Sequence, residues 1–192
     1  MLHSTTKPLR FLPLIALAAG MLASALSSTA CRADTIGNEK VGAIRLGVYY
    51  PANSGVRSDF SSTIASAGLD YNLSESIGTS RSVLGVDYME RSSGANKLQI
   101  IPVTISEQYY REVGGTGWVP YGEAGLGAYF VKAQDPNNAS LVSTHAKTAL
   151  GAFIGGGFDI TDTFFLDLRY HLIPSIKGED PSGYELTAGI RF

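Results

Sequence analysis

Tyr184-Glu185-Leu186-Thr187-Ala188-Gly189-Ile190-Arg191-Phe192 is the stretch that decides the fold class of this chain. Every second side chain in it is apolar, and the side chains between them are polar, charged or absent. Strict alternation over this length is typical of a β-strand with one apolar and one polar face. The stretch runs to the last residue of the sequence. That ending favours a transmembrane barrel, in which the final strand pairs with the first and closes the sheet.

Seven earlier segments show the same alternation. They are residues 41–50, 60–73, 80–91, 97–110, 120–132, 145–158 and 163–172. Ten residues in a strand tilted by about 40° rise roughly 26 Å, which matches the apolar band of an outer membrane. We therefore predict an all-β fold, a closed eight-stranded antiparallel up-and-down transmembrane barrel that occupies residues 41–192.

The N-terminal residues have the composition of a targeting segment. Lys7 and Arg10 precede an apolar run over residues 11–26, and small residues follow it. This order is typical of a secretory signal peptide. The apolar run is also short for a membrane-spanning helix, which needs roughly 20 residues. We predict a signal peptide over residues 1–33, cleaved after Ala30 or Ala33, and a short N-terminal segment over residues 34–40.

Charge and cysteine content narrow the function classes. Removing residues 1–33 takes away three basic residues and no acidic one, so the net charge changes from −2 to −5. An acidic chain without a run of Lys or Arg argues against nucleic-acid binding. The only cysteine, Cys31, lies at the signal junction, so no disulfide is predicted. A retained anchor helix and lipidation of Cys31 are the less favoured alternatives.

The polar faces of the predicted strands carry charges that would point into the barrel. The interior of an eight-stranded barrel is just wide enough to be filled by its own side chains. Charges buried there need partners, because an unpaired one costs several kcal/mol. We predict a filled interior with an ion-pair network, and a narrow or gated path remains the alternative. The predicted network residues are Arg45, Asp70, Arg81, Asp87, Glu123, Lys147, Asp167, Arg169, Glu185 and Arg191.

Two residues fit the pattern of segment 97–110 poorly. Glu107 falls on its apolar face, and Pro102 lies inside a strand that would have no free edge. We expect a local bulge at Pro102. For Glu107 we expect either a bulge or a place near the periplasmic end, where a charge costs little.

Three stretches resemble a known family. They are Ile101-Pro102-Val103-Thr104-Ile105, Pro120-Tyr121-Gly122-Glu123-Ala124-Gly125-Leu126-Gly127-Ala128-Tyr129 and the ending Gly189-Ile190-Arg191-Phe192. The first two resemble the middle of the small outer-membrane barrel family, whose members include OmpA-like, OmpX-like, OmpW-like and opacity-type proteins. The ending resembles the C-terminal sorting signal of bacterial outer-membrane barrels, here Tyr184, Leu186, Ala188, Ile190 and Phe192.

The resemblance implies a location and a set of partners. It implies a protein of the bacterial cell outer membrane that contacts outer-membrane lipids and is inserted by the outer-membrane barrel assembly machinery. We expect a monomer. The resemblance implies no shared catalytic residues, because members of this family do different jobs on one scaffold.

These observations favour a non-enzymatic surface or envelope protein that acts through four outer loops. The loops are expected at residues 51–59, 92–96, 133–144 and 173–182. The alternative is a narrow channel, or a lateral-diffusion transporter for small apolar solutes as in OmpW-like proteins. A secreted lipocalin-like carrier is disfavoured, because it would need an apolar lumen and a polar outside.

A lipid A-modifying enzyme is less favoured. His171, Ser175 and Glu179 could suggest a catalytic set near the outer leaflet. In deacylases, however, the serine follows the histidine by two positions, and here the separation is four. We expect a structural role for His171, and we predict no catalytic residue, metal site or cofactor, since the three histidines form no metal-binding pattern.

Overall fold

The computed structural model describes residues 40–73, 79–93, 96–111, 118–134, 147–175 and 180–192. The predicted signal peptide, most of segment 34–40, His145 and Glu179 lie outside these residues. Within them the chain forms eight strands and one short helix. The elements are β1 (Gly42–Pro51), α2 (Ser54–Asp59), β2 (Ile64–Asn72), β3 (Ser80–Ser93), β4 (Asn96–Tyr110), β5 (Val119–Gln134), β6 (Lys147–Asp159), β7 (Phe164–Leu172) and β8 (Gly183–Arg191).

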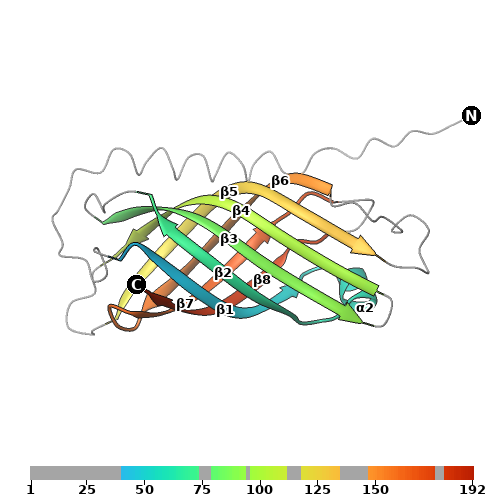
Figure 1. Cartoon of the computed structure of the whole chain (residues 1–192), viewed down its shortest axis with the longest axis horizontal. Coiled ribbons are helices and arrows are strands. Elements are labelled where there is room, and N and C mark those ends of the chain that lie inside the picture. The colour runs from blue at the N-terminus through green and yellow to red at the C-terminus, as the bar shows by residue number, and fades with distance from the viewer. Residues whose placement is uncertain (1–39, 74–78, 94–95, 112–117, 135–146, 176–179) are drawn as a thin grey trace, which may run out of the picture. The chain divides into compact units, whose positions relative to one another are not determined.

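The strands form a closed barrel in sequence order (Figure 1). Each strand pairs antiparallel with the next, and β8 pairs with β1 from Ala43 opposite Arg191 to Pro51 opposite Gly183. The carbonyl of Phe192 continues this seam by accepting from a backbone N–H of β1. The predicted closed antiparallel up-and-down barrel is confirmed.

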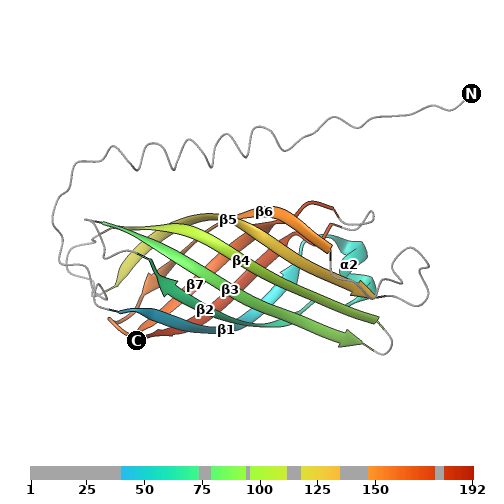
Figure 2. The ribbon, with the colours of Figure 1, turned by 45° about the horizontal axis from the view of Figure 1, so that its top comes forward.

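The two ends of the barrel carry different parts of the chain. The start of β1 and the C-terminal residue lie at one end, and α2 lies at the other (Figure 2). We call these the termini end and the helix end. β4 and β5 have 15 and 16 residues, whereas β7 and β8 have 9 each. The barrel wall is therefore formed by strands of very unequal length.

The outward face of the barrel is apolar. Large hydrophobic side chains are exposed on every strand, for example Leu46 on β1, Leu126 on β5 and Leu186 on β8. They alternate with buried inward-facing side chains. This arrangement reverses that of a water-soluble protein and is typical of a barrel surrounded by hydrocarbon.

No helix in the described part of the chain is long and apolar enough to cross a membrane.

The predicted bulge at Pro102 was wrong. On one side of the proline Val86 lies opposite Val103, and on the other side Met89 lies opposite Ile100, so the register of β3 and β4 does not change. Proline lacks an N–H and removes a ladder hydrogen bond. The strand tolerates this loss without an inserted residue.

Glu107 stays on the outward face of β4 without any shift of register. It lies opposite Ser82 on β3 and Ala124 on β5. Its carboxylate is half-buried and accepts a hydrogen bond from Ser82 Oγ at 2.7 Å. Glu107 is also three residues from the last residue of β4, at the termini end. There is therefore no bulge at Glu107. Its position near the end of β4 agrees with the other expectation, that the charge lies near a strand end, where it costs little.

Residues 51–59, predicted to be an outer loop, contain the helix α2. Asn53 caps it, with Oδ1 accepting from the backbone N–H of Gly55 at 2.7 Å and of Val56 at 3.4 Å. The last residue of α2 is also held, because Asn96 Nδ2 donates to its carbonyl oxygen at 2.7 Å. The segment is therefore ordered against the barrel instead of projecting from it.

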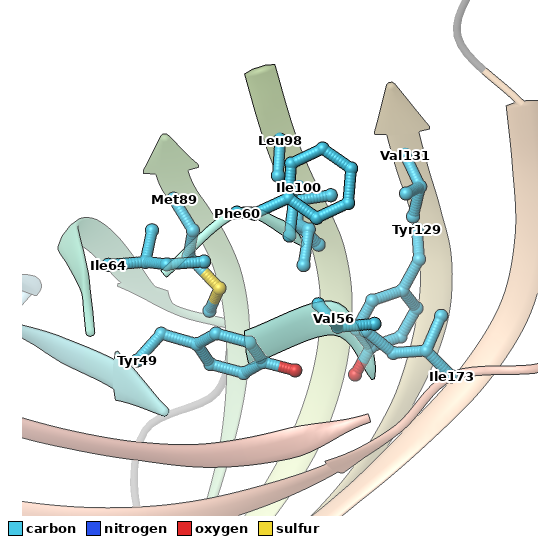
Figure 3. Packing of buried hydrophobic residues seen from close by; sticks show 10 residues of the cluster. All are labelled: Tyr49, Val56, Phe60, Ile64, Met89, Leu98, Ile100, Tyr129, Val131 and Ile173. Carbon is cyan, nitrogen blue, oxygen red and sulfur yellow. The ribbon is translucent and has the colours of Figure 1, made fainter. Parts of the chain in front are cut away.

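An apolar cluster fills the barrel beneath α2 (Figure 3). Val56 from α2 and Phe60, just after it, are almost completely buried in this cluster. We call it the mouth cluster, and its residues are Tyr49, Val56, Phe60, Ile64, Met89, Leu98, Ile100, Tyr129, Val131 and Ile173. It closes the interior at the helix end with side chains from both the strands and the loop.

The cap of α2 gives a first testable prediction. We expect Asn53→Ala to lower the free energy of unfolding by about 1 kcal/mol, because two N–H groups lose their acceptor. Denaturant unfolding of the purified protein in detergent or lipid measures this change. Asn53→Asp retains an accepting oxygen and should match the wild type. An alanine variant as stable as the wild type would show that the cap does not help to hold α2.

Candidate functional site

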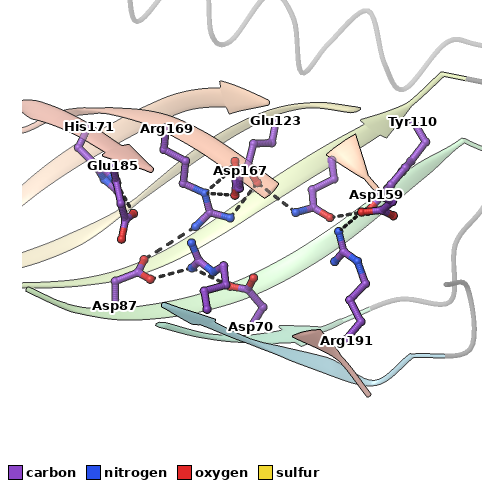
Figure 4. Close-up of polar contacts among 12 residues, drawn as sticks. Asp70, Asp87, Tyr110, Glu123, Asp159, Asp167, Arg169, His171, Glu185 and Arg191 are labelled. Carbon is purple, nitrogen blue, oxygen red and sulfur yellow. Dashed lines mark hydrogen bonds and ion pairs between the residues drawn. The ribbon is translucent and has the colours of Figure 1, made fainter. Parts of the chain in front are cut away.

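The inward faces of the strands meet in a charged layer at mid-barrel (Figure 4). Alternation places one or two charged side chains from each contributing strand on the inside. We call this set the central layer. It consists of Arg45 from β1, Asp70 from β2, Asp87 from β3, Glu123 from β5, and Asp167 and Arg169 from β7. All six are buried.

Arg45 joins three neighbouring strands. Its Nη2 lies 2.9 Å from Asp70 Oδ1 and 2.8 Å from Asp87 Oδ1. Gly68 on β2 makes space for this contact, since a Cβ there would lie 2.1 Å from Asp87 Oδ1. The inward glycine and the large guanidinium group therefore fit together, as a narrow barrel requires.

Arg169, from β7, contacts the carboxyl groups of the central layer from the other side of the barrel. Its Nη2 donates to Glu123 Oε2 at 3.1 Å, and its Nε also pairs with the Glu123 carboxylate. Asp167 Oδ2 lies 2.9 Å from Nε, and Asp87 Oδ2 lies 3.9 Å from Nη1. The guanidinium also stacks over Phe153, 4.8 Å from the ring centre. Arg169 thus connects strands on both sides of the lumen.

A second polar group lies nearer the termini end. Arg191 Nη2 donates to Asp159 Oδ1 at 2.7 Å, and its guanidinium lies 4.1 Å from the ring centre of Phe165. Arg81 lies 5.0 Å from the ring centre of Tyr110. These groups border a small apolar cluster at this end, which we call the terminal cluster. It consists of Ala43, Tyr110, Val119, Tyr121 and Phe165.

Hydrogen bonds run from the central layer towards this second polar group. Gln108 Nε2 donates to Glu123 Oε2 at 3.1 Å, and Tyr110 Oη donates to Gln108 Oε1 at 2.9 Å. The polar part of the interior is therefore continuous from the central layer to the terminal cluster. Together with the mouth cluster, these buried side chains lie along the inside of the barrel from the helix end to the termini end.

His171 lies between the central layer and the mouth cluster and is completely buried. Its Nδ1 is 3.1 Å from Tyr129 Oη and its Nε2 is 3.0 Å from Glu185 Oε2. Both ring nitrogens are thus engaged inside the barrel. Ser175, the candidate partner in a catalytic set, is exposed in the loop after β7. This geometry supports the structural role expected for His171.

Lys147 is the exception among the residues predicted to form the interior network. The structure places the other nine inside the barrel, with buried side chains. Lys147 is exposed at the first position of β6, so its predicted burial was wrong. It lies opposite Val131, near the helix end of the barrel.

Sequence reasoning missed two residues that contribute to the interior. Asp159 lies just beyond the predicted segment 145–158, but it is the last residue of β6 and binds Arg191. Gln108 lies on the inward face of β4 and is buried, but as an uncharged residue it is not part of the predicted ion-pair network. The pairing of Val119 with Asp159 extends β5 and β6 by one residue each, a length that alternation alone does not specify.

Within the described residues, no group of three or more His, Cys, Asp or Glu side chains is arranged to hold a metal ion.

Comparison with known proteins identifies relatives by fold. No protein-family model and no curated protein matches the chain. The chain is similar to the crystal structure of the outer membrane enzyme PagL, with 15% identity, a TM-score of 0.57, and coverage of 78% of this chain and 99% of that one. Neisserial surface protein A, NspA, has 16% identity, a TM-score of 0.55, and coverage of 78% and 92%.

A third similar structure is Ail, the attachment invasion locus protein of Yersinia pestis. It has 16% identity, a TM-score of 0.52, and coverage of 80% of this chain and 99% of that one. At these identities the likeness concerns the fold alone. The resemblance to small outer-membrane barrels is confirmed at that level. The similar structures include an outer membrane enzyme, PagL, as well as NspA and Ail.

Proposed function

We propose that this chain is a non-enzymatic protein of the bacterial outer membrane whose filled barrel anchors surface segments at the helix end. The observation that carries the proposal is the succession of buried side chains along the inside of the barrel. The mouth cluster, the central layer and the terminal cluster follow one another along the barrel. A barrel of eight strands has no room for a water-filled channel beside such side chains.

The apolar outward face supports the membrane location. Leu46, Leu168 and Leu186 are each more than half exposed, which is costly in water and favourable in hydrocarbon. An even number of strands puts both termini on the same side, the periplasmic side in such barrels. α2, the end of β3 and the start of β4 then face outwards. Export through the signal peptide and insertion by the barrel assembly machinery belong to the same proposal.

Conductance provides the main test. We expect the purified wild-type protein to produce no steady single-channel current in planar bilayers, because three successive groups of side chains block the lumen. A variant in which residues 53–60 are replaced by a Gly/Ser linker should also stay closed, because the central layer remains. Steady current through the wild type that changes in Asp87→Asn would contradict the proposal and favour a narrow channel.

Lateral transport of a small apolar solute is the alternative with a specific feature in its favour, the apolar lining of the mouth cluster. Entry of a solute would require α2 to move, because Val56 and Phe60 occupy this space. Cross-linking α2 to the wall, through cysteines at Val56 and Met89, would then abolish uptake. Unchanged uptake in the cross-linked protein would exclude this route.

The fold shared with PagL makes an enzyme test worthwhile. We expect the lipid A mass spectrum of cells that express this chain to match that of cells carrying an empty vector. Ser175→Ala provides the matched control. A modified lipid A that disappears in the Ser175→Ala variant would overturn the non-enzymatic proposal.

A further inference from the structure

The central layer contains more negative than positive side chains. It has two guanidinium groups, from Arg45 and Arg169, and four carboxyl groups, from Asp70, Asp87, Glu123 and Asp167. None of the six is more than 7% exposed. The neighbouring pair of His171 and Glu185 cannot remove this surplus, because a protonated histidine would only balance its own glutamate. The fully ionised layer would therefore hold two excess negative charges. The neighbouring buried group of Arg81, Arg191 and Asp159 carries one net positive charge, which balances at most one of them, so at least one excess negative charge would stay in a sealed interior, at high cost.

The contacts show which carboxyl groups carry the excess negative charge. Two carboxyl groups converge on a single nitrogen of each arginine. Asp70 and Asp87 contact Arg45 Nη2. Glu123 and Asp167 contact Arg169 Nε (Figure 4). The Nε atom carries one hydrogen, and it is directed to Glu123. Asp167 Oδ2 is only 2.9 Å from this nitrogen but receives no hydrogen bond.

The other groups around Asp167 do not relieve this arrangement. β6 presents Gly157 opposite it and β8 presents Thr187 opposite it. Arg45 from β1 and Tyr121 from β5 are near enough to interact with it electrostatically. Neither oxygen of Asp167 accepts a hydrogen bond from any of these groups.

The Glu123 carboxyl group lies beside Asp167, because an oxygen of each contacts the same nitrogen, Arg169 Nε. Two carboxylates cannot hydrogen-bond to each other, because both only accept. A proton on one of them makes the contact favourable, and like charges in a shared site ordinarily lead to such an arrangement.

We infer that the Glu123–Asp167 pair holds one shared proton at neutral pH, with Asp167 donating a hydrogen bond to Glu123. The pair is thus a proton-binding site inside the sealed barrel. The proton removes one of the two surplus charges, and Glu123 keeps its contact with Arg169. Asp167 in the unfolded chain loses its proton above about pH 4, so folding at neutral pH takes up a proton.

Proton uptake on folding has a defined sign. Through this pair the folded state binds one proton more than the unfolded state, so the contribution of the pair to stability falls as pH rises until the pair releases the proton. Asp167→Asn should remove this dependence, because its Nδ2 donates to Glu123 without any proton uptake. The folding constant of the variant relative to the wild type should rise by up to about tenfold per pH unit between about pH 5 and pH 8.

The experiment combines infrared spectroscopy with unfolding of the full chain in detergent or lipid. The wild type should show a carbonyl stretching band of a protonated carboxyl group at neutral pH, and this band should be absent from Asp167→Asn. Asp159→Asn is the matched control, because Asp159 has its own arginine, Arg191, at 2.7 Å. That variant should retain the band and be less stable than the wild type throughout the pH range.

Three results would overturn the inference. The first is a wild type without the band, which decides the question even if no variant folds. The second is an Asp167→Asn variant that is destabilised at every pH as much as Asp159→Asn. The third is wild-type stability near pH 8 that increases with sodium chloride but not with choline chloride at equal ionic strength. That result would show that a sodium ion supplies the missing charge.

Discussion

Arg169→Leu should lower the free energy of unfolding by about 3–5 kcal/mol, the usual cost of removing one partner from a buried ion pair. Arg169 is 2% exposed and contacts Glu123, Asp167 and Asp87 on three strands. Its loss leaves their carboxyl groups in the lumen without this counter-charge. Unfolding in urea, followed by the mobility of the heat-modifiable folded form on gels, measures the change.

Two companion variants separate charge from packing. Arg169→Lys keeps the positive charge but loses the two-pronged contact with Glu123, so its stability should fall between those of the wild type and the leucine variant. Adding Glu123→Gln to Arg169→Leu should recover part of the loss, because one orphaned charge disappears. A leucine variant as stable as the wild type would show that the central layer does not hold the walls together.

Leu168→Arg should destabilise the barrel in the membrane by about 2–4 kcal/mol, the cost of a basic side chain on the lipid face at the bilayer midplane. Leu168 is the central residue of β7, and its side chain is 51% exposed on the outward face. The measurement is the folded fraction in lipid vesicles over a urea series. The neighbouring residue, Arg169, is tolerated because it faces the other way.

Phe164→Arg is the depth control for this prediction. Phe164 lies on the same face of β7, four residues closer to the termini end, and is exposed to a similar degree. Near the interface the penalty for the charge falls to about 0–1 kcal/mol. Equal losses for the two variants, or a Leu168→Arg protein that folds normally in lipid, would contradict the outward assignment of this face.

The barrel itself could be predicted from the sequence because its physical cause is local. Each strand exposes one face to an apolar surrounding and the other to a polar interior, so the side-chain pattern has a period of two. Leu168 and Arg169 show this directly, since adjacent residues take opposite environments. The same pattern placed Arg45 and Arg169 on inward faces, where both are buried.

The closure of the helix end could not be predicted in this way. Val56 and Phe60 are apolar residues four apart in a segment rich in Gly, Ser and Asn, which is typical of a surface loop. The sequence does contain one signal for this helix, because Asn53, a favoured N-cap residue, precedes the two apolar residues. A helix of six residues is too short to be stable alone, so its existence depends on the mouth cluster, which only the closed barrel assembles.

Lys147 shows a second limit of the pattern. Alternation assigns a side chain to a face but does not say whether the wall extends far enough to bury it. The strands of this barrel differ in length, so the inward face at the start of β6 is open to solvent. Pro102 shows a different limit. A proline inside a strand suggests a bulge, but the missing N–H leaves the register of β3 and β4 unchanged.

The seam between β1 and β8 determines when this protein can complete its fold. β1 is among the first parts of the barrel to be synthesised and β8 the last, yet they share nine paired positions. Until β8 arrives, β1 and the newest strand each present an unpaired edge, the feature through which nascent chains aggregate. Contacts between such distant parts of a chain also form slowly. We therefore expect the polypeptide to need a chaperone until β8 has paired with β1.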